Sequence, residues 1–104
     1  MKEVMKNVLQ AAVTHHAVCS VKLKNEPTTR RLHPYGLLKN PGGKHMLICW
    51  QEDGHSISKK LPNFRTLPID EVSNLEITTD SFDIQQKFNP TNKMYKGWEF
   101  HLSK

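Results

Sequence analysis

Two different spacings of apolar residues divide the chain. Between Val4 and Val13 the apolar residues recur every three or four positions, with charged and polar residues between them. This spacing is typical of an amphipathic helix with one buried face. From Ala17 onward, short apolar runs alternate with turn residues and the helical spacing is lost. The pattern predicts a leading helix within residues 1–16, followed by strands within residues 17–80.

Short apolar runs separated by turn residues predict a series of strands. The predicted strands are Ala17–Lys24, Arg30–Leu38, Lys44–Trp50, Phe64–Ile69 and Val72–Thr78, with a short one at Ile57. Pro34 has no amide hydrogen to donate, so it predicts an edge or a bend in the second strand. Asn40-Pro41-Gly42-Gly43 is the clearest turn signal. This spacing favours a small antiparallel barrel or a strongly bent sheet.

The last part of the chain, residues 81–104, is predicted to be a tail with one short helix. Asn89 is a favourable helix cap, and Pro90 suits the first helical position. Gly97 is expected to end this helix. The predicted fold class is therefore mainly β (α+β), with an N-terminal helix and a short C-terminal helix.

Composition and charge limit the size of the fold and suggest a partner. The 104 residues fit one domain, 1–104, and an apolar fraction of 37% supplies one modest core. The net charge is +5, with nine Lys and Arg against three acids from Lys22 to Arg65. Residues 66–86 hold five acids and no base. This distribution is either ordinary solvated surface charge or an anion-binding face with an acidic back.

The sequence offers no positive indication of catalysis, a cofactor or a metal. Cys19 and Cys49 lie in apolar runs without CxxC spacing, so we expect buried free thiols. His45 and Cys49 share a strand face, but no further ligand lies at a zinc-site spacing. The common hydrolase, metalloprotease and P-loop motifs are missing. We expect a non-enzymatic cytoplasmic protein without a cofactor, a metal or a membrane span.

Basic and aromatic residues in the middle of the chain are the candidates for ligand binding. Adjacent residues on a strand face opposite ways, so Arg30 and Arg31 should point to different faces. Arginine can hold a phosphate or carboxylate with two parallel hydrogen bonds, and neighbouring rings can stack on nucleobases. The candidate ligand-binding residues are Arg30, Arg31, Tyr35, His45 and Arg65. Trp50 and Phe64 are interleaved with them and either fill the core, which is favoured, or stack on a ligand.

The order of these segments resembles a WYL domain, a family named for a Trp-Tyr-Leu triplet. The resemblance rests on Arg30 to Leu37 (RRLHPYGL), Lys44 to Gln51 (KHMLICWQ) and Phe64 to Val72 (FRTLPIDEV). It implies an SH3- or Sm-like β-barrel. It also implies a ligand-sensing role, because WYL domains are usually attached to transcriptional regulators and several bind nucleic acid or a nucleotide-like anion.

The chain departs from the WYL pattern at the residues that would form its pocket. The triplet is His45-Met46-Leu47, and the family's second arginine falls at Glu71. Another frequent arginine falls at Pro68. A carboxylate in place of a cation weakens an anion pocket. Two hypotheses therefore stay open: a nucleic-acid or nucleotide-binding regulatory module, or a protein-interaction or homo-oligomerisation module with a degenerate pocket.

Overall fold

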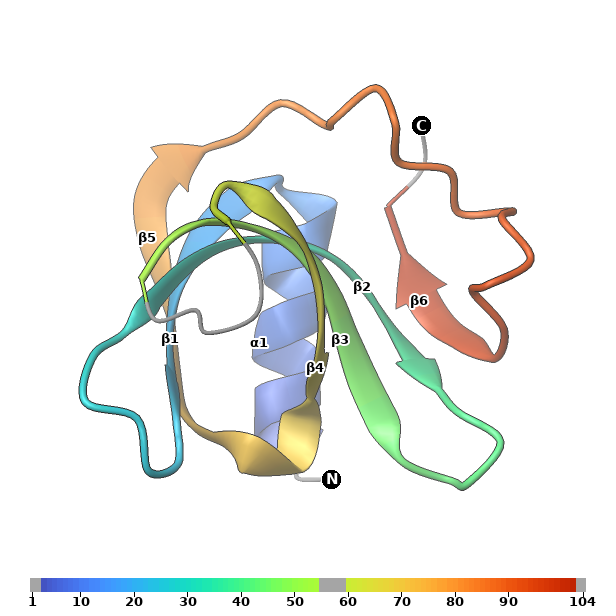
Figure 1. The fold of residues 1–104 in the computed structure, drawn as a ribbon, viewed down its shortest axis with the longest axis horizontal. Coiled ribbons are helices and arrows are strands. Elements are labelled where there is room, and N and C mark those ends of the chain that lie inside the picture. Colours follow the sequence, from blue (N-terminus) through green and yellow to red (C-terminus); the bar gives the residue numbers. More distant parts are fainter. Residues whose placement is uncertain (1–2, 55–59, 103–104) are drawn as a thin grey trace.

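The computed structural model describes residues 3–54 and 60–102, and these form one helix and one sheet (Figure 1). The helix is α1 (Glu3–Thr14). The strands are β1 (Ala17–Leu23), β2 (Arg30–Lys39), β3 (His45–Asp53), β4 (Asn63–Pro68), β5 (Val72–Ser81) and β6 (Trp98–His101), and the 3-10 turn η1 (Ile69–Glu71) links β4 to β5. The expected mainly β fold with an N-terminal helix is confirmed. The strand predicted at Ile57 lies outside the described residues.

All the described strand pairs are antiparallel, in the order β4-β3-β2-β1-β5, with β6 added to β2. The first half of β2 pairs with β1, and its second half pairs with β6 from Gly36 to Leu38. The register against β3 shifts between Pro34 and Gly36, where this change of partner occurs. The sequence predicted an edge or a bend at Pro34, and the structure has a register shift there within a strand that is paired on both sides. The described pairings leave the sheet open between β4 and β5.

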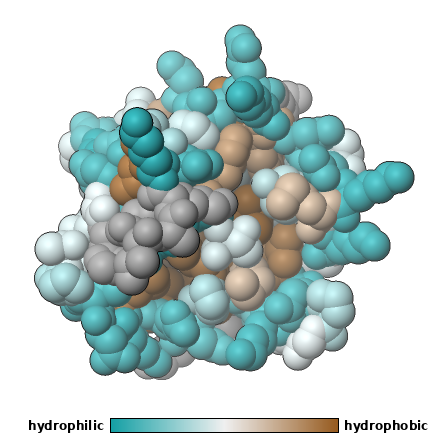
Figure 2. Space-filling model, viewed as in Figure 1, coloured by the Kyte–Doolittle hydropathy of each residue, from teal (hydrophilic) through white to brown (hydrophobic). Residues whose placement is uncertain are grey.

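The core lies between α1, the sheet and the segment that follows β5. In Figure 1 α1 lies behind the strands, and it packs on β1, β2 and β5 through Leu9, Ala12 and Val13. Figure 2 shows hydrophobic residues at the centre of the opposite face and hydrophilic residues around its margin. With only 12 residues in α1, the described chain has no helix that could cross a bilayer.

Both cysteines are free and buried, as the sequence predicted. Burial raises the pKa of the Cys19 thiol to about 11 and that of the Cys49 thiol to about 12. The neutral thiol is therefore the stable form of both groups at neutral pH, and the thiolate that a nucleophile needs is scarce.

The prediction of a C-terminal helix is wrong. Residues 82–97, here called the C-terminal segment, run along the surface in loops and turns before β6 begins. The side-chain oxygen of Asn89 accepts the amide hydrogen of Thr91 (3.1 Å), and Asn92 does the same for Met94 (3.1 Å). Asparagine that bonds the backbone two residues on stabilises a turn as readily as it caps a helix.

Aromatic packing explains why turns form here instead of a helix. The rings of Phe88, Tyr95 and Trp98 contact one another, with centroid distances of 5.4–6.5 Å. The Trp98 indole also donates a hydrogen bond to the carbonyl oxygen of Pro90 (2.9 Å). In a straight helix Phe88 and Trp98 would lie about 15 Å apart along the axis, so their ring contact requires the chain to turn back on itself.

Candidate binding site

Arg30, the first predicted ligand-binding residue, belongs to the interior. Its side chain is paired with Glu26 (Nε–Oε1 3.0 Å, Nη2–Oε2 2.5 Å) and donates to Oε1 of Gln51 (3.1 Å). Arg30 is 5% exposed and Gln51 is fully buried. With these partners the Arg30 guanidinium is part of a buried hydrogen-bond network, and it has little surface left for a ligand.

Arg31 points to the opposite face, as the strand alternation predicted. It forms ion pairs with Glu52 at the end of β3 and with Asp80 at the end of β5. Hydrogen bonds to Asp80 and Glu52 raise the pKa of the Arg31 guanidinium above its usual value. Glu52 also contacts Nε2 of His33 (2.6 Å). Two carboxylates therefore offset the charge that was predicted to hold an anion.

The other predicted residues do not complete a pocket with the arginines. Tyr35 is fully buried, and its hydroxyl oxygen accepts the amide hydrogen of Gln85 (3.0 Å). His45 bonds Glu99 (2.9 Å) at the start of β3. Arg31 pairs in register with Asp53 at the far end of that strand. His45 and Asp53, the β3 partner of Arg31, are eight residues apart, which corresponds to about 26 Å along a strand.

Arg65 lies in a third part of the sheet, the middle of β4. It is half-buried there and pairs in register with Cys49. Because paired residues share a face, Arg65 lies on the face of Cys49, whereas its neighbour Phe64 lies on the face of Trp50. The five residues predicted to bind a ligand are therefore spread between the interior, two strand ends and one strand centre.

A different set of side chains gathers on the Trp50 face of the sheet. His33, Trp50 and Phe64 are register partners across β2, β3 and β4. Trp50 and Phe64 meet edge to face, with 4.8 Å between ring centroids and an interplanar angle of 78°. Phe82 stacks on His33 at 4.8 Å. The C-terminal segment thus covers part of this face and leaves the Trp50–Phe64 pair at its margin.

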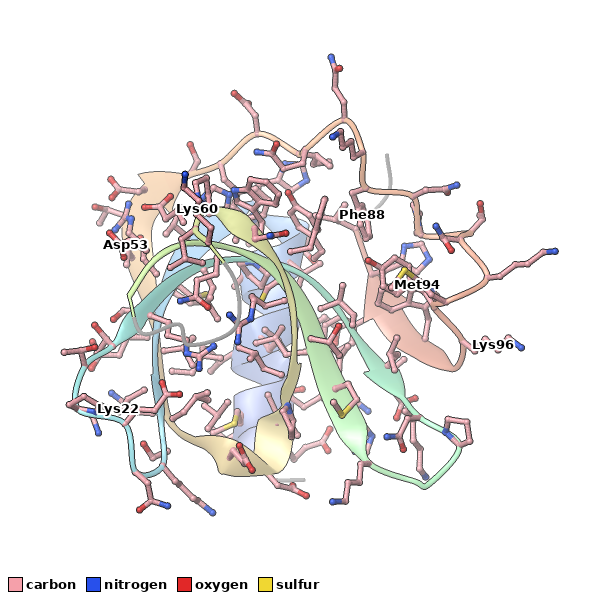
Figure 3. The ribbon with its side chains drawn as sticks, viewed as in Figure 1. Lys22, Asp53, Lys60, Phe88, Met94 and Lys96 are labelled. Atoms are coloured by element: carbon pink, nitrogen blue, oxygen red, sulfur yellow. The ribbon has the colours of Figure 1, made fainter. Side chains whose placement is uncertain are left out.

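A cavity of about 340 Å³ opens at that margin. Its lining residues are Trp50, Phe64, Gln85, Gln86 and Lys87, and this set is called the Trp50 cavity below. Both aromatic rings are half-buried. They pack on the core and also line the cavity, so each ring combines the two roles that were predicted from the sequence as alternatives. Figure 3 places Lys60 near the end of β4 that carries Phe64.

The chemistry of the Trp50 cavity suits a planar, polar ligand with an attached anion. Its volume falls in the range of small-molecule sites, about 300–1,000 Å³. The rings offer faces for stacking, the two glutamine amides can both donate and accept hydrogen bonds, and the Lys87 ammonium can pair with an anion. The backbone of Gln85 is fixed by its hydrogen bond to Tyr35.

Sequence reasoning did not find Gln85, Gln86 or Lys87. Short polar runs of this kind are common in loops, and only the folded chain brings them against β3 and β4. The sequence held only an indirect sign that this run lies against the sheet. The run is flanked by Phe82 and Phe88, and the structure buries both rings.

Other parts of the surface offer less chemistry. A cavity of about 210 Å³ between α1 and β5 is lined mainly by apolar residues, among them Val4, Met5 and Leu75. Within residues 3–54 and 60–102, no three His, Cys, Asp or Glu side chains lie close enough together to hold a metal ion. The Trp50 cavity therefore offers more polar and aromatic groups than the cavity between α1 and β5.

Comparisons of the chain with protein-family models, with curated proteins and with solved structures found no match.

Proposed function

We propose that this protein is a non-catalytic binding module whose ligand carries a nucleobase and a phosphate, bound in the Trp50 cavity. One observation carries the proposal: a half-exposed pair of aromatic rings lines a cavity together with two amides and a lysine. Stacking on aromatic rings contributes about 1–3 kcal/mol per base. The amides can bond the edge of the base, and Lys87 can pair with its phosphate.

The proposal places the protein among WYL-type regulatory modules of the cytoplasm, with a binding site of its own. The strand order and the η1 turn between β4 and β5 fit the small SH3- or Sm-like barrel that the resemblance implies. The binding residues differ from those of the family pattern, because Arg30 and Arg31 are engaged by carboxylates. The ligand is instead assigned to the Trp50 cavity.

Tryptophan fluorescence provides the direct test. Trp98→Phe leaves Trp50 as the only tryptophan, and titration with AMP should quench its emission as the base stacks on the ring. Binding of a labelled AMP, followed by anisotropy, should weaken about tenfold or more in Trp50→Leu, because the stacking contribution is lost.

The matched control is the second tryptophan, which lies outside the cavity lining. Trp98→Phe should bind labelled AMP as the unmodified protein does. The proposal fails if no nucleoside monophosphate binds, or if Trp50→Leu and the unmodified protein bind equally well while circular dichroism shows both to be folded.

A second candidate function, self-association or protein interaction, has one observation in its favour. In the described chain β4 and β5 each have a strand neighbour on one side only. Unpaired strand edges can add a strand from another chain. Ile77 on β5 is 44% exposed and would lie at such a contact. A sedimentation coefficient that rises with protein concentration would support this function.

A further inference from the structure

The C-terminal segment carries a line of positive charge away from the Trp50 cavity. Lys87 lines the cavity, and Lys93 and Lys96 follow along the same segment. All three lysines are exposed, and no ion pair within the described residues involves them. The sequence has no acidic residue between Asp83 and Glu99. These three lysines are called the lysine track.

Apolar and aromatic side chains lie beside the lysine track. Met94 is 70% exposed. Tyr95 and Trp98 are half-buried, with 5.4 Å between their ring centroids. Figure 3 shows Phe88, Met94 and Lys96 following one another down the side of the molecule that β6 occupies in Figure 1.

We infer that the ligand is a single-stranded nucleic acid that enters the Trp50 cavity with one base and follows the lysine track with its phosphates. This inference rests on the proposed function and extends it from one nucleotide to a strand. A mononucleotide can use Lys87 alone, whereas a strand brings further phosphates to Lys93 and Lys96. Each neutralised phosphate releases counterions, so additional contacts strengthen binding at low salt.

The aromatic residues favour a single strand over a duplex. Ring stacking requires bases with free faces, and the bases of a duplex are already stacked on each other. Alternation of lysines with aromatic and apolar side chains, as in the run Lys93-Met94-Tyr95-Lys96, is a feature of surfaces that bind unpaired strands. The track follows one segment whose two ends are fixed: the Phe82 amide bonds the carbonyl oxygen of His16 (2.9 Å), and the carbonyl oxygen of Gly97 accepts the amide hydrogen of Lys39 (2.9 Å).

The experiment compares AMP with an oligonucleotide of about ten adenosines, a length within the site sizes of single-strand-binding domains. Two variants of the full chain each remove two positive charges: Lys93→Gln with Lys96→Gln on the track, and Lys22→Gln with Lys24→Gln as the control. Figure 3 shows Lys22 on the opposite side of the molecule from Lys96. Affinity is measured by anisotropy across ~50–200 mM salt.

The oligonucleotide should bind the unmodified protein at least about tenfold more tightly than AMP at low salt, because it reaches more cations. The track variant should lose most of this advantage, and its salt slope should fall by about 1.4, since each single-strand phosphate contact contributes about 0.7. AMP affinity should stay unchanged in the track variant. The control variant should retain both the oligonucleotide affinity and the slope.

Three results would overturn the inference, and they are separate from failure of the proposed function. An oligonucleotide that binds no more tightly than AMP would show that no track exists. An equal loss in the two double variants would show that only net charge matters. An oligoglutamate that binds as tightly as the oligonucleotide would assign the track to an acidic peptide. Absence of AMP binding alone would instead contradict the proposed role of the Trp50 cavity.

Discussion

Arg30 and Arg31 are adjacent in the sequence and have different structural roles. Arg30 points inward to Glu26 and Gln51, and Arg31 points outward to Glu52 and Asp80. The opposite orientations were predictable from strand alternation. The partners of Arg31 were not predictable, because Glu52 and Asp80 belong to other parts of the chain. A cluster of bases in the sequence therefore indicates charge, and only the contacts decide whether a ligand can use it.

The buried pair makes a prediction at the scale of one residue. Glu26→Gln removes the charge that offsets Arg30, so a guanidinium with 5% exposure is left unpaired. We expect the free energy of unfolding to fall by about 3–5 kcal/mol, because breaking a buried ion pair leaves an uncompensated charge. Urea denaturation monitored by circular dichroism measures this change.

The control is the same substitution at an exposed glutamate. Glu76 lies on the surface of β5, so Glu76→Gln should change the urea midpoint far less. Equal midpoint shifts in the two variants would contradict the structural role assigned to Glu26.

At the scale of elements, β2 organises the sheet by changing partners along its length. Its first half pairs with β1 and its second half with β6. Gly36 lies close against β6: an added Cβ would lie 2.6 Å from the backbone oxygen of Phe100 and 2.6 Å from the Trp98 ring. A side chain at this position would push β6 away from β2.

Gly36→Ala should therefore destabilise the fold by about 1–3 kcal/mol, the usual cost of adding atoms to a filled space. Gly42→Ala is the matched control, because the nearest atom to its added Cβ is 3.4 Å away. Thermal unfolding compares the two variants, and an unchanged melting temperature in Gly36→Ala would show that β6 does not pack as described. Hydrogen exchange at Phe100 and His101 should also speed up in Gly36→Ala alone.

The element predictions succeeded where the signal was local and apolar. The helix and five strands were found because their hydrophobic spacing is set by the face that each one buries. The strand predicted to end at Trp50 continues to Asp53, through the buried Gln51. The C-terminal helix failed, and β6 was missed, because both depend on contacts with β2 and with the aromatic residues around Phe88.

At the scale of the whole molecule, Glu99 joins elements that are far apart in the sequence. It lies on β6, bonds His45 of β3 and pairs with Lys6 of α1 (3.9 Å). The hydrogen bond from His45 and the charge of Lys6 lower the pKa of the Glu99 carboxyl below its ordinary value of 4.5. Sequence could not predict this junction, because it depends on the position of a strand that was not expected.

The lowered pKa gives a pH dependence with a definite sign. A carboxyl whose pKa is lower in the folded state stabilises the fold above its ordinary value, and this contribution is lost as the pH falls through the folded-state pKa. The melting temperature of Glu99→Gln should therefore lie below that of the unmodified protein at neutral pH. The difference should close in the acid range below 4.5. A difference that stays constant as the solution is acidified would contradict the role of Glu99.

The fixed ends of the C-terminal segment have a consequence for how this protein can change. The C-terminal segment is held by the Phe82 amide, by the buried Phe88 ring and by the Gly97 carbonyl oxygen, and residues 91–94 form an exposed loop between these anchors. Doubling the length of such a loop costs only about 0.6 kcal/mol of closure entropy. Residues can therefore be inserted in this exposed loop at little cost to the fold. The proposed lysine track is thus free to vary in length and charge while the buried anchors and the sheet beneath it stay the same.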